Sequence, residues 1–447
     1  MNLIGKLFIS PHLRDSLEIP IQSEINVRVG SLIVRTRLII REGNKKSYML
    51  SPELNKALLL KTRKKYKIRY DHQNNIVHIG PTIGILAISL PNKNEFDPKG
   101  VQAELIYLSN IAKNYLGQVY IFTPNSIDWS SKTTKGYVYK YIRPHYGVWT
   151  SARYPLPDVV YDRITTRRSE SKTSIQKTKD NLMSLPYLKY FNPSFLDKWK
   201  VHQVLDSNPQ LNDYLPETYS FSKENIESMI QKYSTLYLKP IHGSLGKGII
   251  KLTKDKSGKL HYIIHRTGRI RGKADNIEEF IKKTKKSHGN RPYIVQQGIN
   301  LAKYKGAPFD IRIIFQKNSK GNWQISKKFA RVAPRGSSIS NLSSGGKVQT
   351  TKKTFRYLFN KKDTIEARNK EIKNMCLKIA KTIENSYDGT FGELGLDIGI
   401  DIKGHPWLIE VNSKPRKTTE TVFSKIIVKN TFKRPIEFSI YLAGFCK

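Results

Sequence analysis

The first 78 residues show the pattern of hydrophobic and polar positions expected of β-strands. Residues 25–40 form a long run of β-branched side chains that is broken at Gly30, which predicts a β-hairpin. A short helix is expected at 52–60 and another strand at 66–70. The pattern therefore predicts a small β-rich N-terminal module over residues 1–78.

The pattern changes to strand, helix, strand over residues 79–165. An apolar strand is expected at 80–86 and another at 118–122. Between them lies an apolar stripe at helical spacing, made of Val101, Leu105, Leu108, Ala112 and Tyr115. This order predicts a βαβ unit with a small parallel sheet. Residues 166–190 are polar and lysine-rich, which indicates a helical linker, and residues 191–447 form the remaining unit.

A glycine-rich loop between two apolar strands is the first candidate for phosphate binding. Glycines let the backbone approach phosphate oxygens and direct N–H groups toward them. The pattern is not a Walker A loop, and it does not lead into a helix as a dinucleotide fingerprint does. Flanking lysines favour a phosphate lid, with a plain β-turn as the alternative. The candidate residues are Lys239, Gly243, Ser244, Gly246, Lys247 and Gly248.

Acidic residues on an expected hairpin near the C-terminus form the second candidate. Alternation at every second residue places three of them on one strand face, namely Glu393, Asp397 and Asp401. On the following strand Glu410 and Asn412 share a face. A turn centred on Lys403 and Gly404 predicts that Asp397 lies opposite Glu410.

Two carboxylates that face each other on a sheet repel unless a cation lies between them. Oxygen ligands from Asp397, Glu410 and Asn412 suit Mg²⁺. Gly395 and Gly399 are expected on the same face, where they would leave room for a ligand. The alternative is an ordinary solvent-facing side of a sheet.

An apolar strand at 310–315 carries a third candidate. Asp310 and Arg312 share one face of it, either as a structural ion pair or with Arg312 contacting phosphate. His261 and His265 have a spacing that joins two metal ligands only on a helix, and their surroundings predict a strand. A zinc site is therefore not expected there.

The composition predicts a folded and strongly basic protein. Of 447 residues, 78 are Lys or Arg and 36 are Asp or Glu, which gives a formal net charge of +42. Such a surface attracts an anionic surface or polymer, although it can also be simply a solvated basic surface. A nucleic-acid partner is disfavoured because no motif for one is present. The two cysteines exclude a disulfide framework, and Cys376 falls on an apolar helical stripe.

Taken together, these motifs resemble the YheC/YheD endospore coat-associated family of the ATP-grasp superfamily. The resemblance covers nearly the whole chain and rests on several segments rather than on one. They are residues 80–86, 157–163, 238–240, 296–299, 309–312, 341–346 and 409–415. It implies an α+β and α/β architecture, in which an ATP-grasp domain of two α+β lobes follows a Rossmann-like pre-ATP-grasp unit and the N-terminal module.

The resemblance also implies roles for individual residues. Lys198 and Lys239 would contact the ATP phosphates, and the strand with Gln296, Gln297 and Ile299 would line the adenine and ribose. The metal ligands would be Asp397, Glu410 and Asn412, which agrees with the register argument. Catalytic contacts to the transferred phosphate would come from Arg312, Arg331 and Asn341. Arg416 stands where many relatives have Gly, so this family pattern does not define the substrate contacts there.

The implied function is that of an ATP-dependent carboxylate–amine ligase with ATP and Mg²⁺ or Mn²⁺ as cofactors. It would phosphorylate a carboxylate and couple the acyl phosphate to an amine, with a peptide or a cell-envelope component among the substrate classes. The alternative is a non-catalytic ATP-binding protein that is docked in the spore coat through its basic surface. The N-terminal sequence lacks the pattern of a signal peptide and no apolar stretch could span a membrane, which predicts a cytoplasmic or spore coat-associated protein.

Overall fold

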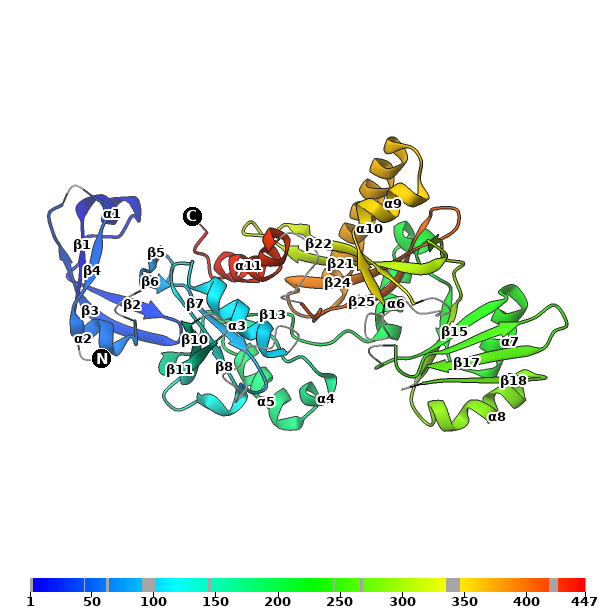
Figure 1. Cartoon of the computed structure of the whole chain (residues 1–447). Helices are drawn as coiled ribbons and strands as arrows, with labels where there is room; N and C mark the ends of the chain where they lie inside the picture. Colours follow the sequence, from blue (N-terminus) through cyan, green and yellow to red (C-terminus); the bar gives the residue numbers. More distant parts are fainter. Residues whose placement is uncertain are drawn as a thin grey trace.

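The computed structural model describes residues 3–43, 45–61, 64–90, 101–143, 146–243, 246–265, 268–334, 346–417 and 425–446. These residues form four β-sheets that follow one another along an elongated molecule (Figure 1). The N-terminal module lies at one end, and the lobe drawn in green lies at the other. Among these residues, no helix has the length and apolar character required to cross a membrane.

The first sheet forms the N-terminal module. Its strands, in spatial order, are β4 (Tyr48–Leu50), β1 (Lys6–Ile9), β3 (Leu32–Ile40), β2 (Glu24–Val29), β6 (Ile76–Gly80) and β5 (Lys67–Asp71). Two short helices, α1 (Pro11–Ser16) and α2 (Pro52–Ala57), accompany it. The antiparallel pairing of β2 with β3 confirms the predicted hairpin. Gly30 turns it with a φ of 54°, and a Cβ there would lie 2.2 Å from the carbonyl oxygen of Leu156.

The second sheet contains the predicted βαβ unit. In spatial order its strands are β11 (Tyr146–Pro155), β10 (Thr133–Arg143), β8 (Gln118–Phe122), β7 (Thr82–Leu86), β12 (Val159–Asp162) and β13 (Lys189–Phe191). β9 (Ile127–Asp128) pairs with β10, and η1 (Pro124–Ser126) precedes it. The parallel pairing of β7 with β8, joined through α3 (Val101–Ala112), confirms the strand–helix–strand prediction.

The segment expected as a linker contributes to this second sheet. It contains α4 (Arg167–Glu170) and α5 (Thr173–Met183), and it ends where β13 pairs in parallel with β12. Ile175 and Leu182 of α5 are buried in one core with Val160 of β12. Residues 166–190 are therefore packed against the sheet.

The third sheet forms the green lobe of Figure 1. In spatial order its strands are β14 (Thr218–Ser220), β19 (Tyr293–Gln297), β15 (Thr235–Pro240), β16 (Ile250–Lys254), β17 (Leu260–His265) and β18 (Arg269–Ala274). Two helices, α7 (Lys223–Lys232) and α8 (Ile277–His288), pack their apolar residues against it. The candidate site described below lies on the opposite face of this sheet.

The fourth sheet is also covered on one face by helices. Its strands, in spatial order, are β23 (Lys347–Gln349), β22 (Trp323–Val332), β21 (Ala307–Lys317), β24 (Glu393–Ile400) and β25 (Pro406–Asn412), with β20 (Lys303–Tyr304) beside β21. The elements around it are α6 (Lys198–Asp206), η2 (Pro209–Tyr214), α9 (Thr351–Leu358) and α10 (Lys362–Ser386). Cys376 of α10 is fully buried in this core, as predicted.

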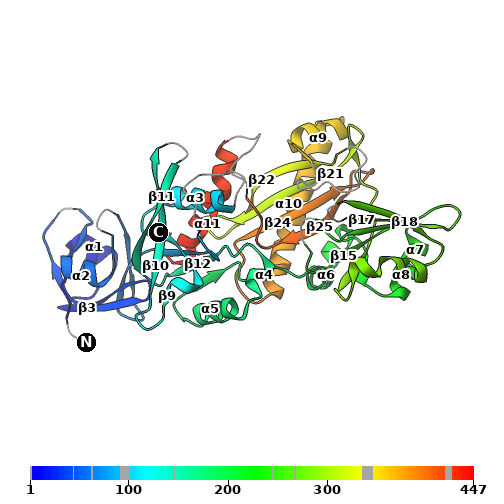
Figure 2. The same cartoon turned by 60° about the horizontal axis from the view of Figure 1, so that its bottom comes forward.

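The last helix, α11 (Lys425–Leu442), lies between the second and fourth sheets (Figures 1 and 2). Phe432 and Ile436 pack in the core of the second sheet with Ile83 and Tyr161. On the other side, Arg434 donates a hydrogen bond to Ser326 of β22 at 2.6 Å. The C-terminal helix therefore holds two sheets together that are distant in sequence.

Two groups of buried ion pairs join the same two sheets. In the first, which we call the Arg163 network, Arg163 and Lys417 each lie 2.9 Å from the carboxylate of Glu393, and Glu104 of α3 also pairs with Arg163. In the second, the Lys414 network, the members are Asp162, Glu170, Lys179 and Lys414. Each network contains two cations and two carboxylates, so its formal charges balance.

Glu393→Gln is expected to destabilise the protein by about 3–5 kcal/mol, the usual cost of breaking a buried ion pair on one side. The substitution keeps the shape of the side chain but leaves Arg163 and Lys417 with too little negative charge. The measurement is the free energy of unfolding in urea. Glu366→Gln is the matched control, because Glu366 forms an exposed pair with Lys362 that contributes less than about 1 kcal/mol. Equal effects of the two substitutions would contradict the assignment.

Candidate active site

The predicted pairing of Asp397 with Glu410 is confirmed. The strand pairing that leads to it differs from the prediction. Ile400 pairs with Pro406 and Ile398 with Leu408, one residue out of the predicted register. A β-bulge at Ile409 then adds one residue to β25 and restores the pairing. The two carboxylates consequently lie on neighbouring strands, on the face of the sheet opposite α10.

Arginines from two other strands surround Asp397. Arg312 of β21 donates to one carboxylate oxygen at 2.6 Å, and Arg331 of β22 lies 2.9 Å from the other. Arg331 also donates to Asp310 at 2.9 Å, so Asp310 pairs with Arg331 instead of Arg312. Burial alone would raise the pKa of Asp397, but the two guanidinium groups outweigh it and lower the pKa. Asp397 is therefore held as a carboxylate.

Lys198 links the acidic pair to the glycine-rich loop. It is the first residue of α6, whose N-terminus is capped by the Asp197 side chain. The Lys198 ammonium donates to the carbonyl oxygen of Gly243 at 2.6 Å and lies 3.0 Å from Glu410. One lysine thus contacts both the glycine-rich loop of the third sheet and strand β25 of the fourth sheet, which we call the two lobes of the candidate site.

Lys239 extends from β15 toward the same region. Only 9% of it is exposed, and its ammonium donates to the side-chain oxygen of Gln296 on the neighbouring strand β19. The pKa of Lys239 is lowered to about 8: burial is the main cause and Lys198 adds to it, while Glu410 and Asp397 partly offset these effects. Lys239 is therefore close enough to the acidic pair to be influenced by it.

The glycine-rich loop connects β15 and β16 as predicted. Gly246 and Gly248 have φ values of 72° and 82°, which favour glycine over other residues. The Gly248 N–H donates to the carbonyl oxygen of His265 at 2.7 Å, and Lys247 is exposed. Two predicted site residues, Ser244 and Asn341, lie outside the described residues.

The strand predicted to line a nucleotide is β19 with the residues that follow it. Gln297 accepts a hydrogen bond from the backbone N–H of Glu217 at 3.1 Å, and Ile299 is half-buried. The next residues cross to the fourth sheet, where Leu301 forms a bridge to Asp401. This segment is therefore one connection between the two lobes.

The expectation that Gly395 and Gly399 leave room for a ligand is wrong. A Cβ on Gly395 would lie 2.8 Å from Pro415, and one on Gly399 would lie 2.6 Å from Leu301. Protein side chains fill both spaces. The other predicted acidic residues are also occupied, since Glu393 belongs to the Arg163 network and Asp401 accepts hydrogen bonds from the turn at Lys403.

Sequence reasoning missed a residue that supports this hairpin. Asn192 is fully buried, and its side-chain amide donates to the carbonyl oxygens of Glu393 and Ser413. Its side-chain oxygen accepts from the backbone N–H of Gly392 at 2.9 Å. Asn192 thus ties the start of β24 to the residue after β25. Its φ of 57°, which favours Asn among non-glycine residues, follows no pattern that the sequence shows.

Asp397, Glu410 and Asn412 offer oxygen donors of the type that Mg²⁺ or Mn²⁺ binds. Asn412 pairs with Gly395 in the row next to Asp397. Within the described ranges, no three His, Cys, Asp or Glu side chains converge on a metal position, and Arg312, Arg331 and Lys198 supply the positive charge beside the carboxylates. These oxygen donors fit a divalent cation, which would take over part of the charge compensation that the arginines and Lys198 now provide.

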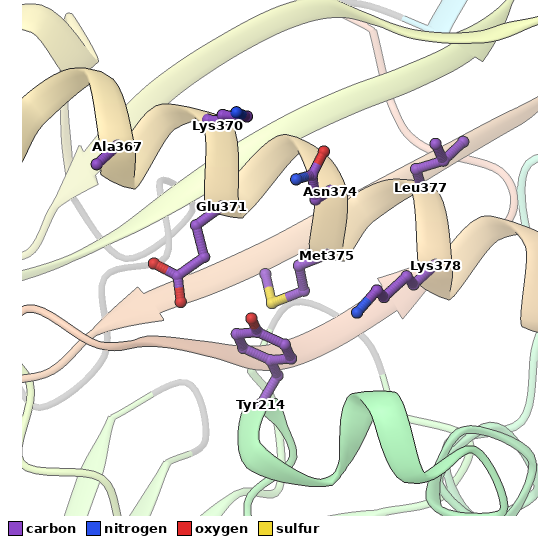
Figure 3. Close-up of a pocket in the computed structure, with 8 residues that line it drawn as sticks. All are labelled: Tyr214, Ala367, Lys370, Glu371, Asn374, Met375, Leu377 and Lys378. Carbon is purple, nitrogen blue, oxygen red and sulfur yellow. The ribbon is translucent and has the colours of Figure 1, made fainter.

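A separate shallow cavity of about 450 Å³ lies beside the outer part of α10 (Figure 3). Tyr214 of η2 forms one wall, and Glu371, Asn374 and Lys378 of α10 are among the residues on the other. The apolar core between α10 and the fourth sheet separates this cavity from the face that carries Asp397. It is therefore not part of the candidate site.

A family model described as YheC/D-like ATP-grasp matches residues 187–442. The endospore coat-associated protein YheD of Bacillus subtilis is 29% identical over 427 residues, which cover 94% of this chain and 91% of that protein. The endospore coat-associated protein YheC of the same organism is 28% identical over 326 residues, which cover 70% of this chain and 86% of YheC.

Solved structures with a similar arrangement include D-alanyl-alanine synthetase A from Vibrio cholerae. It has a TM-score of 0.46 and 14% identity, with 82% of this chain and 99% of that chain covered. The D-alanine–D-alanine ligase from Coxiella burnetii has a TM-score of 0.46 and 13% identity, with 81% and 96% covered.

The pH dependence of stability should reveal the buried Lys239. Its pKa is lowered from an ordinary value of 10.5 to about 8, so between these values the unfolded chain binds more protons than the folded chain. The free energy of unfolding of the wild type, relative to Lys239→Met, should therefore rise from about pH 8 to 10.5 and be flat below about pH 7. Urea unfolding across this range measures it. A difference that stays constant with pH would show that Lys239 titrates normally.

Proposed function

Because this chain belongs to the YheC/D-like ATP-grasp family, we propose that it is a ligase that uses ATP to join a carboxylate to an amine. The observation that carries the proposal is the double contact of Lys198 with Gly243 and Glu410. It brings a glycine-rich loop suited to phosphates next to a pair of carboxylates suited to a divalent cation. A phosphoryl group could be held between the two lobes at this point.

In the first step, an oxygen of the substrate carboxylate attacks the γ-phosphorus of ATP. The bond between that phosphorus and the β–γ bridging oxygen breaks, and ADP leaves. Arg312 and Arg331 lie beside Asp397, where they can bind oxygens of the transferred group. Positioning and charge neutralisation account for most of the catalysis of such transfers, which fits a site built from Lys, Arg and carboxylates.

In the second step, the amine attacks the carbonyl carbon of the acyl phosphate, the amine loses a proton and inorganic phosphate leaves. Lys198 and Lys239 hold the nucleotide phosphates in both steps, and Gln296 aligns Lys239. Asp397, Glu410 and Asn412 would hold a divalent cation, which would neutralise phosphate charge when bound. The glycine-rich loop limits access of water to the acyl phosphate.

The biological setting that we propose is the spore coat or envelope. The relatives YheD and YheC are named endospore coat-associated proteins. A net charge of +42 is suited to attachment to an anionic surface or polymer there. The carboxylate and the amine then belong to peptides or envelope components.

Hydroxylamine should trap the acyl phosphate. With ATP, Mg²⁺ and pools of amino acids, peptides and cell-wall acids, and with hydroxylamine in large excess over the amines of the pools, a hydroxamate should form in step with ADP. The reason is that an acyl phosphate reacts readily with this nucleophile, whereas a phosphorylated alcohol does not. Mass spectrometry of the hydroxamate then identifies the carboxylate.

Glu366→Gln, which alters an exposed residue of α10, should leave the hydroxamate yield unchanged. Formation of ADP without hydroxamate in the presence of a confirmed substrate would replace the ligase proposal with a kinase or an ATPase. ATP binding without any cleavage across the pools would favour a non-catalytic nucleotide-binding protein.

Glu410→Gln should lower turnover by about 10²-fold or more, the scale of losing one electrostatic contact in the transition state. It should also weaken ATP binding when Mg²⁺ is present. Without Mg²⁺, the variant should bind ATP at least as tightly as the wild type, because Glu410 then only repels phosphate and competes for Lys198. Calorimetric titration with and without Mg²⁺ distinguishes these cases. Identical affinities under both conditions would remove Glu410 from the metal site.

A further inference from the structure

Arg167 lies at the carboxyl edge of the parallel strands in the second sheet. It is the first residue of α4, the helix that follows β12 along the chain. Lys198 follows the neighbouring strand β13, which runs parallel to β12. In sheets with parallel strands, ligands bind beside the carboxyl ends of the strands. The two cations therefore come from adjacent loops at the edge of the sheet that is suited to a ligand.

Direct contacts place the Arg167 side chain beside the start of α6. Its guanidinium donates from Nη2 to the carbonyl oxygen of Leu196, two residues before Lys198. It also lies 5.0 Å from the centre of the Phe195 ring. Since the Lys198 ammonium lies 3.0 Å from Glu410, a short chain of contacts joins Arg167 to the acidic pair of the candidate site.

The charge of Arg167 is not balanced by an ion pair. Burial lowers the pKa of this half-buried arginine, and the negative charges of Glu170, Asp197 and Glu410 partly offset that effect. Each of these carboxylates already has another partner, in the Lys414 network, at the N-terminus of α6 or at Lys198. Among the described residues, none pairs with the Arg167 guanidinium and none accepts a hydrogen bond from its Nε or Nη1. These donors therefore remain for an anion.

Arg167 lies on the side from which the substrate carboxylate approaches in the proposed reaction. The second and third sheets lie on opposite sides of the fourth sheet in both views (Figures 1 and 2). ADP leaves on the side of the third sheet, which carries Lys239 and the glycine-rich loop. The attacking oxygen enters in line with the leaving oxygen, from the opposite side of the γ-phosphorus. The second sheet with Arg167 is on that side.

We propose that Arg167 binds the substrate carboxylate that is to be phosphorylated. The inference rests on the proposed ligase function and assigns it a substrate-binding residue. One carboxylate oxygen accepts hydrogen bonds from the guanidinium donors that Leu196 leaves unused, and the other oxygen keeps its lone pair for the attack on phosphorus. Arg312 and Arg331 bind the transferred phosphoryl group, so arginines of two different sheets hold the two reacting groups.

Substitution of Arg167 should separate binding of the acid from binding of ATP. In the hydroxylamine assay with the same pools at limiting acid, Arg167→Met should lower the hydroxamate yield about 10–100-fold, the scale of losing hydrogen bonds to a charged group. Its affinity for ATP with Mg²⁺, measured by calorimetric titration, should match that of the wild type. Arg167→Lys, which keeps the charge, should retain part of the yield. If Arg167 served only to hold Leu196, the loss would extend to ATP binding, because Lys198 follows Leu196 closely.

Arg168→Met is the matched control, because Arg168 is the next residue of α4 and is exposed. It should change neither the hydroxamate yield nor the affinity for ATP. A second readout needs no variant and no turnover, since phenylglyoxal modifies arginine side chains and mass spectrometry locates the modified residues. Acetate with ADP and Mg²⁺ should slow the modification of Arg167 but not that of Arg168. Acetamide, which is uncharged, should slow neither.

Equal effects of the two Met substitutions on the hydroxamate yield would overturn this inference and leave the ligase function in place. Equal protection of Arg167 and Arg168 by acetate would do the same. Failure of the wild type to form a hydroxamate from any pool would overturn the ligase function, and this inference with it.

Discussion

The balance of buried charge between the second and fourth sheets is the constraint on which the structure depends. A charge removed from water is tolerated only when an opposite charge and hydrogen bonds compensate it. The Arg163 network and the Lys414 network meet this condition only if α3, β12, β24 and the residues after β25 are all in place. Lys414, the first network residue after β25, lies two positions after Asn412. The site hairpin is therefore fixed from its end by contacts that serve folding.

Much of the fold could be predicted from local patterns, and the long-range contacts could not. The hairpin around Gly30 and the unit of β7, α3 and β8 follow from alternation, helical spacing and turn residues. The position of α11 could not be predicted in this way, because its apolar residues predict a buried helix but do not indicate which sheet the helix packs against. Residues 166–190 are rich in lysine, which suggested a linker, yet Lys179 is buried by its pairing with Glu170 and Asp162.

The acidic pair was predicted correctly although part of the reasoning was wrong. The pairing nearest the turn is one residue out of the predicted register, and the bulge at Ile409 compensates. A bulge is invisible to a strict period of two, which would place Leu408 on the face of Glu410, whereas Leu408 is in the core. The glycines at 395 and 399 were misread for a related reason. A missing side chain shows that something approaches closely, and here that is Pro415 and Leu301.

The contacts of Lys198 have a consequence for how ligands would affect one another. Its ammonium is shared between Gly243 and Glu410, while Asp397 is held by two arginines. Phosphates would compete with carboxylates for these cations, and a divalent metal would compete with the cations for the carboxylates. Each ligand would thus release the groups that the other needs. Such reciprocal release is a favourable coupling free energy, by which metal and nucleotide each raise the affinity for the other to the same degree.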